Sequence, residues 1–433
     1  MNTSLQTNDT KVNKAYQNTV EIEPNLGAYL GIYGKYSSSH EYQGLQPFTA
    51  LESADDFIVD PVTGEILFTE KSYSPENTII ERFILQSAAR KLLFNSTVTG
   101  IKTCLLCRHK KVEVEGEGIA KISVYHSKNH KTSSFGGLQT CASVWVCAIC
   151  AAKISERRRI EVKKAMDQHT AQGGEVLLLT LTNPHSQRDD LKEHLKNQSK
   201  VLDHFNGGRP MQSLRKTIGY IGQIRALEVT HGRLREFNNG WHPHYHNLLF
   251  VQGGVDIAAL ENELYKLWVT AWLKKAPDCR LPDREHGIKL ENGSMASAYV
   301  TKSGSNWGLE SEITKGHIKK AKGGESPFDL LRAYALDDDK QGGALFREFG
   351  EAFKGKRQLH WSPGLKAQFN LDDITDQEIA AQMDDDAVIL GEIDIEDWRL
   401  IIKYEMRGDV LVLGRRGDWE PIKRLIECLR GTK

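Results

Sequence analysis

The feature that most constrains the fold is a stretch of alternating histidines that runs directly into an apolar segment, WHPHYHNLLFVQGG. Side chains two positions apart in a β-strand lie on the same face, with their Cα atoms about 6.6 Å apart. His242, His244 and His246 would therefore line one face of a strand. The apolar residues that follow indicate that this strand and its neighbours are buried, which excludes a loose loop at this position.

Segments on both sides of the histidine strand alternate between strand and helix patterns. Two more strands are expected at EVLLLTLTN and IGYIGQIRALEVT. The expected fold class is α+β, with a largely antiparallel central sheet and packed helices. Helical periods or helix-forming composition cover residues 77–94, 151–172, 188–205, 255–275, 294–304, 326–335, 344–355 and 420–429.

Glu228 is a candidate third ligand beside the histidines. It lies on the strand expected before the histidine strand, so antiparallel pairing would bring its carboxylate to the imidazole face. Two imidazoles and a carboxylate suit Mn²⁺, Mg²⁺ or Zn²⁺ and leave positions open for chemistry. His244, His246 and Glu228 are therefore the candidate metal ligands. The alternative is a set of surface histidines on an exposed strand.

Four of the seven cysteines form two CxxC pairs, Cys104 with Cys107 and Cys147 with Cys150. Four thiolates at such spacings bind Zn²⁺ tetrahedrally in closed, structural sites. We therefore expect structural zinc at these four residues. The gap between the pairs is longer than in compact zinc fingers, so Cys141 is an alternative ligand. A redox CxxC is the competing interpretation, although no thioredoxin-like context surrounds either pair.

A segment rich in small residues, SMASAYVTKSG, carries a candidate nucleophile. Tyr299 is followed three positions later by Lys302, which places both on one face of an expected helix. A phenol has a reference pKa near 10, so a tyrosine nucleophile needs a nearby metal or cation that favours phenolate. The chain has 13 tyrosines, and residue type alone favours a Tyr packed on the core.

The segments LLLTLTNP, ALEVT…GWHPHYHNLLF and AYVTK, in this order, resemble the three motifs of plasmid rolling-circle replication initiators. These proteins belong to the superfamily of His-hydrophobe-His endonucleases. CASVWVCAICAAKISERRR, ESPFDLLRAY and FKGKRQLHWSPGLK resemble further elements of the family, and the resemblance covers about residues 100–370. It implies that His244 and His246 hold a catalytic Mg²⁺ or Mn²⁺. It also implies that Tyr299, assisted by Lys302, nicks single-stranded origin DNA and forms a 5′-phosphotyrosine.

The chain departs from the family pattern at two positions. Some relatives carry a second Tyr four residues after the nucleophile, or a Glu four residues before it, where this chain has Ser303 and Met295. The group that performs the second, terminating transfer is therefore not assigned, and Glu310 and Glu312 are candidates to activate a water. The implied partners are plasmid origin DNA, a host helicase and a host polymerase.

The total charge carries no nucleic-acid signature, because Lys+Arg and Asp+Glu are both 57 and the formal net charge is zero. The cations instead gather in three clusters, interpreted here as phosphate contacts, with an ordinary solvated face as the alternative. Arg157, Arg158, Lys319 and Lys320 are the main candidates. The clusters comprise Lys153, Arg157, Arg158, Arg159, Lys163 and Lys164; Lys315, Lys319, Lys320 and Lys322; and Lys354, Lys356 and Arg357.

Acidic residues after Leu371 balance these cations and are expected to face away from DNA. Two tryptophans, Trp307 and Trp361, are candidates to stack on unpaired bases, with a place in the core as the alternative.

The chain divides into four expected regions. Residues 1–95 form a partly disordered N-terminal region, 96–165 a zinc-binding module with a basic helix, 166–365 the endonuclease domain, and 366–433 an acidic C-terminal accessory region. The N-terminus is polar and no apolar run reaches the roughly 20 residues that span a bilayer, so a cytoplasmic protein is expected. Two other functions compete with replication. One is a transposase or relaxase of the same superfamily, and the other is a non-catalytic, zinc-containing DNA-binding regulator.

Overall fold

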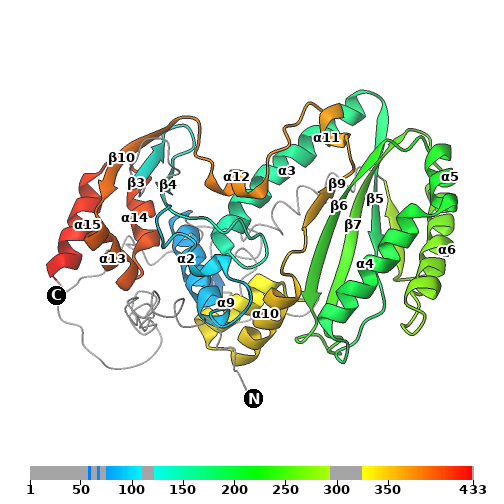
Figure 1. Ribbon diagram of the computed structural model, residues 1–433, viewed down its shortest axis with the longest axis horizontal. Coiled ribbons are helices and arrows are strands. Elements are labelled where there is room, and N and C mark those ends of the chain that lie inside the picture. The colour runs from blue at the N-terminus through cyan, green and yellow to red at the C-terminus, as the bar shows by residue number, and fades with distance from the viewer. Residues whose placement is uncertain (1–56, 60–65, 69–74, 110–120, 293–323, 432–433) are drawn as a thin grey trace, which may run out of the picture.

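The computed structural model describes residues 57–59, 66–68, 75–109, 121–292 and 324–431. These residues form an α+β structure in which two antiparallel sheets lie at opposite ends and helices lie between them (Figure 1). The expected fold class is therefore confirmed as α+β with antiparallel sheets. A separate antiparallel pair of short strands, β1 (Phe57–Val59) and β2 (Ile66–Phe68), comes first in the chain.

The larger sheet has five strands in the order β8-β5-β7-β6-β9, and all neighbours are antiparallel. Its three central strands are the three that the sequence predicts, β5 (Gly174–Leu181), β6 (Gly222–His231) and β7 (Trp241–Gln252). The short edge strands β8 (Ile288–Glu291) and β9 (Leu359–Trp361) were not expected. The first predicted residues of β6 instead form a turn, because Gly219 adopts a φ of +57°.

One face of the larger sheet is covered by α4 (Leu191–Gly207), α5 (Arg209–Thr217) and α6 (Ile257–Lys275) (Figure 1). Odd-numbered residues of β7 point to this face, and Trp241, Tyr245 and Leu249 are buried in its core with Trp268 of α6. From Trp241 to Asn247, buried residues alternate with half-buried ones, as expected for a strand. The buried, odd-numbered residues face the helices, and the half-buried, even-numbered histidines face the other side.

Among the residues that the structure describes, the opposite face of the sheet is covered at one end only. Leu248 and Phe250 of β7 pack there with Val162 and Met166 of α3 (Ala148–Ala171) and with Leu365 of α11 (Leu365–Gln368). Helix α3 ends where the sequence predicts, since Gly173 takes a φ of +84° directly after its cap. The other end of this face carries the histidines.

Three helices occupy the centre of the molecule, α2 (Pro75–Leu92), α9 (Pro327–Asp337) and α10 (Lys340–Ala352) (Figure 1). Helix α2 begins at Pro75, inside a segment expected to be loop, and proline suits the first position of a helix because it lacks an N–H. A single 3₁₀ turn, η2 (Gly100–Lys102), follows it. None of the described helices is both long and apolar enough to cross a membrane.

The smaller sheet has the order β10-β3-β4 and joins distant parts of the chain. Strand β10 (Ala387–Ile393) comes from the expected C-terminal accessory region, whereas β3 (Ile122–Ser127) and β4 (Thr132–Gly136) come from the expected zinc-binding module. These two regions therefore share one sheet. The remaining C-terminal helices are α12 (Asp376–Ala381), α13 (Ile395–Lys403), α14 (Arg407–Gly414) and α15 (Glu420–Gly431).

Candidate metal centres

The register of β6 and β7 brings Glu228 and two histidines together on the face of the larger sheet that lies opposite α4, α5 and α6. Glu228 pairs directly with His244, and His246 lies two residues further along the same face. Glu228 Oε2 is 3.5 Å from His244 Nε2 and 3.6 Å from His246 Nε2. Ligand atoms about 2.1 Å from one divalent ion lie about 3.0–3.4 Å apart. The carboxylate oxygen is therefore within tenths of an ångström of that separation from each imidazole, and all three ligand atoms lie within 4.8 Å of one another.

Both imidazoles are oriented by hydrogen bonds at their other ring nitrogen. His246 Nδ1 lies 2.9 Å from the hydroxyl of Thr180, which pairs with His246 across β5 and β7. His244 Nδ1 lies 3.1 Å from the backbone carbonyl of His242. Such contacts fix the ring and leave Nε2 available to a metal. Thr180 was not among the predicted site residues, although its place in the first motif, LLLTLTNP, could have indicated that it lies near the histidines.

Burial keeps His246 and His242 neutral near pH 7. It lowers the pKa of His246 to about 4, with a smaller contribution from His244 in the same direction that Glu228 opposes. Burial, together with the charges of His244 and His185, lowers the pKa of His242 to about 2. A neutral imidazole is the form that binds a metal.

His242 shares the face of the two candidate ligands but lies outside the three-residue group. Its ring stacks on His185, with centroids 4.4 Å apart and planes 11° apart, and its centroid is 4.7 Å from that of His244. The three alternating histidines thus divide into two candidate ligands and one ring that packs beside them.

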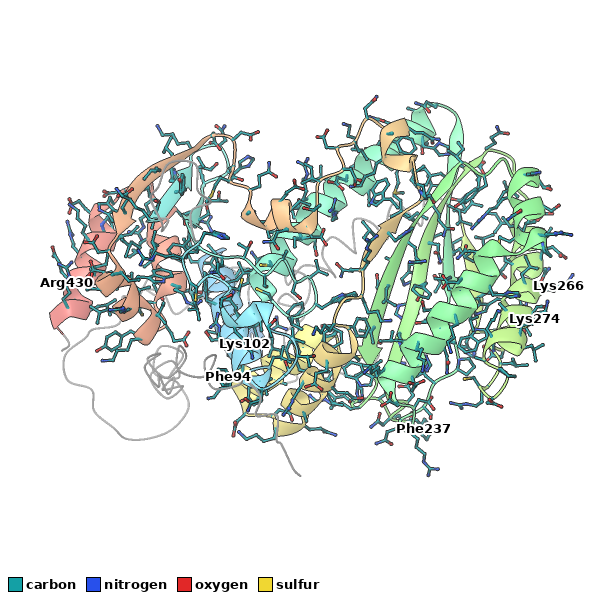
Figure 2. All side chains as sticks on the ribbon, viewed as in Figure 1. Phe94, Lys102, Phe237, Lys266, Lys274 and Arg430 are labelled. Carbon is teal, nitrogen blue, oxygen red and sulfur yellow. The ribbon has the colours of Figure 1, made fainter. Side chains whose placement is uncertain are left out.

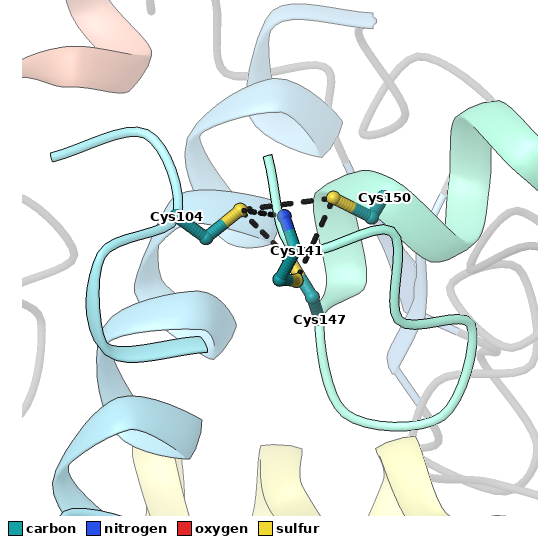
Figure 3. A group of neighbouring side chains, drawn as sticks. All are labelled: Cys104, Cys141, Cys147 and Cys150. Atoms are coloured by element: carbon teal, nitrogen blue, oxygen red, sulfur yellow. Dashed lines mark hydrogen bonds between the residues drawn. The ribbon is translucent and has the colours of Figure 1, made fainter. Parts of the chain in front are cut away.

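A second group of candidate ligands consists of Cys104, Cys141, Cys147 and Cys150 (Figure 3). The Sγ atom of Cys104 is 3.8 Å from that of Cys147 and 3.7 Å from that of Cys150, and Cys141 Sγ is 3.8 Å from Cys150 Sγ. Four sulfurs bound tetrahedrally at about 2.3 Å from zinc lie about 3.8 Å apart. A disulfide would need about 2.05 Å. The spacing therefore fits a closed zinc site.

The fourth member of this group is Cys141 and not Cys107, which corrects the expected ligand set. After Cys104 the chain turns at Leu105, which has a φ of +51°. Cys107 is exposed, and its carbonyl accepts a hydrogen bond from Gln139 N at 2.8 Å. This pairing brings Cys141 back toward the buried sulfurs and leaves Cys107 outside them.

The cysteine group is set into a polar environment that suits thiolates. Cys147 is the residue before the first turn of α3, and Cys150 lies in that turn, near the positive end of the helix dipole. Gln86 of α2 donates to Cys147 Sγ at 3.3 Å, and the backbone N–H of Cys141 donates to Cys104 Sγ at 3.4 Å. Burial opposes ionisation of Cys147, but hydrogen bonds from the other three thiols outweigh it and hold its pKa well below the ordinary value.

The cations of α3 form ion pairs and hydrogen bonds within the chain, and their interpretation as phosphate contacts stays a prediction. Arg158 is 2.8 Å from Glu161 and 2.8 Å from Asp376 of α12, and Arg157 is 3.5 Å from Glu161. Lys153 donates to the carbonyl of Ala380 at 3.2 Å. Part of the acidic C-terminal region therefore covers the basic helix.

Trp361, a candidate to stack on unpaired bases, packs against the smaller core beside α11, with Lys366 Nζ 5.6 Å from its ring centroid.

Tyr299 and Lys302 lie outside the described residues, as do Lys319 and Lys320. So do Met295, Ser303, Trp307, Glu310, Glu312, Lys315 and Lys322. The described chain stops at Asn292, just after edge strand β8, and resumes at Gly324. Glu325 then bridges to His231 at the end of β6, three residues from Glu228.

Comparison of the sequence with known families gives a match over part of the chain. The family model described as "Replication protein" matches residues 137–276. This segment of the chain is therefore similar to a replication-protein domain. It includes Glu228, His244, His246 and three of the four clustered cysteines, whereas Cys104 and Tyr299 lie outside the matched residues.

Of two individual relatives, one has a name that agrees with the replication-protein match. A protein described as "Protein rep" from Streptomyces lividans is 27% identical over 362 residues, which cover 67% of this chain and 78% of the relative. A "Neomycin resistance protein" from Streptomyces cyanogenus is 30% identical over 141 residues, or 27% of this chain and 31% of that protein. No solved structure gives a significant match. The matches support a plasmid replication initiator and confirm the resemblance to plasmid replication proteins.

Proposed function

We propose that the protein initiates rolling-circle plasmid replication by nicking and rejoining single-stranded origin DNA. The observation that carries this proposal is the Glu228–His244–His246 group, which strand register holds on the larger sheet inside the segment that matches the replication-protein family. Its three side chains are between 12% and 23% exposed, so they are both rigidly placed and accessible.

These three residues would hold the catalytic ion, for which Mg²⁺ or Mn²⁺ is proposed. When bound, such an ion polarises a phosphate oxygen and stabilises the charge that develops on it. Thr180 and the carbonyl of His242 orient the two imidazoles, and burial keeps His246 unprotonated. Three protein ligands would leave further coordination positions for water or a DNA phosphate.

Tyr299 is the proposed nucleophile. Its phenolic oxygen would attack the scissile phosphorus, so that a bond from tyrosine oxygen to phosphorus forms while the bond from phosphorus to the 3′ oxygen breaks. The products are a 5′-phosphotyrosine and a 3′-OH, which a host polymerase can extend. The phosphotyrosine keeps the energy of the broken bond, so later rejoining needs no ATP. Lys302 would stabilise the developing negative charge.

The Cys104–Cys141–Cys147–Cys150 group is proposed to bind one structural Zn²⁺. Its sulfurs are buried or half-buried and close on all sides, which is typical of a structural site and leaves no open position for chemistry.

A labelled single-stranded oligonucleotide that spans the nick site tests the endonuclease proposal on a denaturing gel. With Mn²⁺ or Mg²⁺, the parent protein should form a covalent adduct, and Tyr299→Phe should form none because only the oxygen is removed. The double variant His244→Ala with His246→Ala should also fail, whereas Lys302→Ala should react more slowly. An adduct with Tyr299→Phe would show that another tyrosine is the nucleophile, and full activity of the double histidine variant would remove the metal assignment.

A further inference from the structure

The loop between β6 and β7, residues 232–240, exposes an apolar tip next to the histidine end of the larger sheet. Phe237 is 80% exposed, the highest value among the large hydrophobic residues of the described chain, and Leu234 is 48% exposed. Figure 2 shows Phe237 at one end of this sheet, well separated from Phe94 in the helical centre. Strand residues that lead into the loop pair as Thr230 with His242 and Glu228 with His244, so the loop lies just beyond the candidate metal ligands.

The base of this loop is fixed, while its tip is exposed. Gly232 N donates to the Gly240 carbonyl at 2.9 Å, and Asn239 Nδ2 lies 2.9 Å from His185 Nε2. Arg233 pairs with both carboxylate oxygens of Glu325, at 2.7 Å and 2.9 Å, and is 2.6 Å from Asp339. Gly240 has a φ of +72°, and a Cβ there would come within 2.8 Å of the backbone of Gln187. The fold thus holds the loop in one position with Phe237 presented to solvent.

Arg235 supplies a positive charge between this loop and the histidine face. No carboxylate lies within ion-pairing distance of its guanidinium among residues 57–59, 66–68, 75–109, 121–292 and 324–431, and its Nε is buried without an acceptor there. Its backbone N–H donates to the Gly232 carbonyl at 3.1 Å, which places it in the turn at the base of the loop, where Asn239 meets the His185 ring that stacks on His242. Neighbouring Arg233 differs, because it is neutralised by Glu325 and Asp339.

We propose that the 232–240 loop binds the unpaired DNA strand beside the nick site, with Phe237 stacked on a base and Arg235 in contact with a phosphate. This inference rests on the proposed function. An aromatic ring next to a cation is the combination that single-strand binding uses, because every base offers a flat face and every nucleotide a negative charge. The rigid base of the loop lowers the entropy that binding would otherwise cost. No base edge is read in this way, so the contact is independent of sequence.

Binding of fluorescein-labelled oligo(dT), followed by fluorescence anisotropy without added divalent metal, tests the proposal. Phe237→Ala should bind about tenfold more weakly, the loss typical of one stacked base, whereas Phe237→Tyr should bind like the parent. Phe94→Ala is the matched control, since Phe94 is also a well exposed phenylalanine, at 63%, but lies away from the sheet.

A salt titration of the same binding tests the contact of Arg235 with a phosphate. Arg235→Gln should reduce the slope of log affinity against log salt by about 0.7, as expected for one lost phosphate contact on a single strand.

Equal binding by Phe237→Ala and the parent would overturn the proposal, as would an equal loss in Phe94→Ala. So would an equal loss on a blunt duplex, which has no unpaired base to stack. A change of oligomeric state in Phe237→Ala with unchanged DNA binding would assign the loop to a protein contact instead. Nicking is measured separately with metal, so failure of the tyrosine test would leave this binding result standing, and failure of the binding test would leave the endonuclease assignment standing.

Discussion

Thr180 supports the Glu228–His244–His246 group without being one of its ligands. Replacing it with valine keeps the shape of the side chain and removes the hydroxyl that meets His246 Nδ1 at 2.9 Å. Losing such a supporting contact typically costs ten- to a hundred-fold in metal affinity, so we expect Thr180→Val to bind Mn²⁺ at least about tenfold more weakly. Calorimetric titration of Mn²⁺ measures the change directly.

Thr180→Ser is the matched control, because it restores the hydroxyl. It should recover most of the Mn²⁺ affinity, and the thermal melting of both variants should stay close to that of the parent. Unchanged Mn²⁺ affinity in Thr180→Val would mean that this hydroxyl does not orient His246.

The two competing cysteines give a second single-residue prediction. Cys141 lies in the sulfur cluster and Cys107 is exposed outside it. Cys141→Ser should therefore lower the zinc content of freshly purified protein and its melting temperature, whereas Cys107→Ser should keep both. Metal analysis by mass spectrometry and a thermal melt check the pair. Zinc lost from Cys107→Ser and kept in Cys141→Ser would restore the ligand set expected from the CxxC spacing.

These two centres show what sequence can and cannot predict about single residues. Glu228 was predictable, because neighbouring antiparallel strands joined by a short loop must bring their polar positions together. Cys107 was favoured only by its CxxC spacing. Its exclusion depends on the left-handed Leu105 and on the pairing of this loop with residues 137–139, and neither leaves a signal in the local pattern.

Among the elements, the end of strand β6 is expected to make the protein sensitive to acid. Burial, assisted by the charge of Arg233, lowers the pKa of His231 to about 4, and its Nδ1 accepts the N–H of Arg233 at 3.1 Å. In the unfolded chain a histidine titrates near 6.5, so between these two values the unfolded state binds more protons. This contribution to the free energy of unfolding is complete above about pH 6.5 and decreases as the pH falls toward 4.

Replacing His231 with asparagine removes the titration while keeping an acceptor near Nδ1. Urea unfolding at about pH 7 and about pH 5 should show a smaller loss of stability in His231→Asn than in the parent. His286→Asn, at an imidazole that is 71% exposed, is the control and should keep the parent's pH dependence. An identical pH dependence in His231→Asn and the parent would contradict the prediction.

Long elements were predictable and short ones were not. The central strands β5, β6 and β7 carry apolar runs or strict alternation, and α4, α6 and α10 have clear helical periods. Strands β3 and β4 lie in a segment rich in Ser, His and Lys for which no strand was predicted, and β10 lies in an acidic segment. These short strands are stabilised by the strands they pair with, and the local sequence does not show which strand that will be.

For the whole molecule, the pairing of β10 with β3 shows that the C-terminal region contributes a strand to the smaller sheet. Ala387 pairs with Ser127 and Ile393 with Ile122, so residues far apart in the chain complete one sheet. Composition alone separated these regions, because one is acidic and the other carries cysteines. Folding instead joins them, and helix α14 packs on α2, which also supports the sulfur cluster.

Arg407 is the side chain that links these parts, and its replacement tests whether they act as one unit. It is 1% exposed, and it donates to Gln86 at 2.9 Å, to the Leu105 carbonyl at 3.2 Å and to Ser87 at 3.1 Å. Gln86 in turn donates to Cys147 Sγ.

Arg407→Met keeps much of the volume but leaves these acceptors and Glu405 without the buried cation, so the free energy of unfolding should fall by about 3 kcal/mol or more. Urea unfolding followed by circular dichroism measures the loss, and zinc should be released over the same urea range as the helical signal. Arg159→Met is the control: it also removes an arginine with two hydrogen bonds, here to the exposed Glu156 one turn earlier in α3, and it should change stability little. If Arg407→Met released zinc without losing cooperative unfolding, or unfolded like the parent, the C-terminal helices and the cysteine cluster would be separate units.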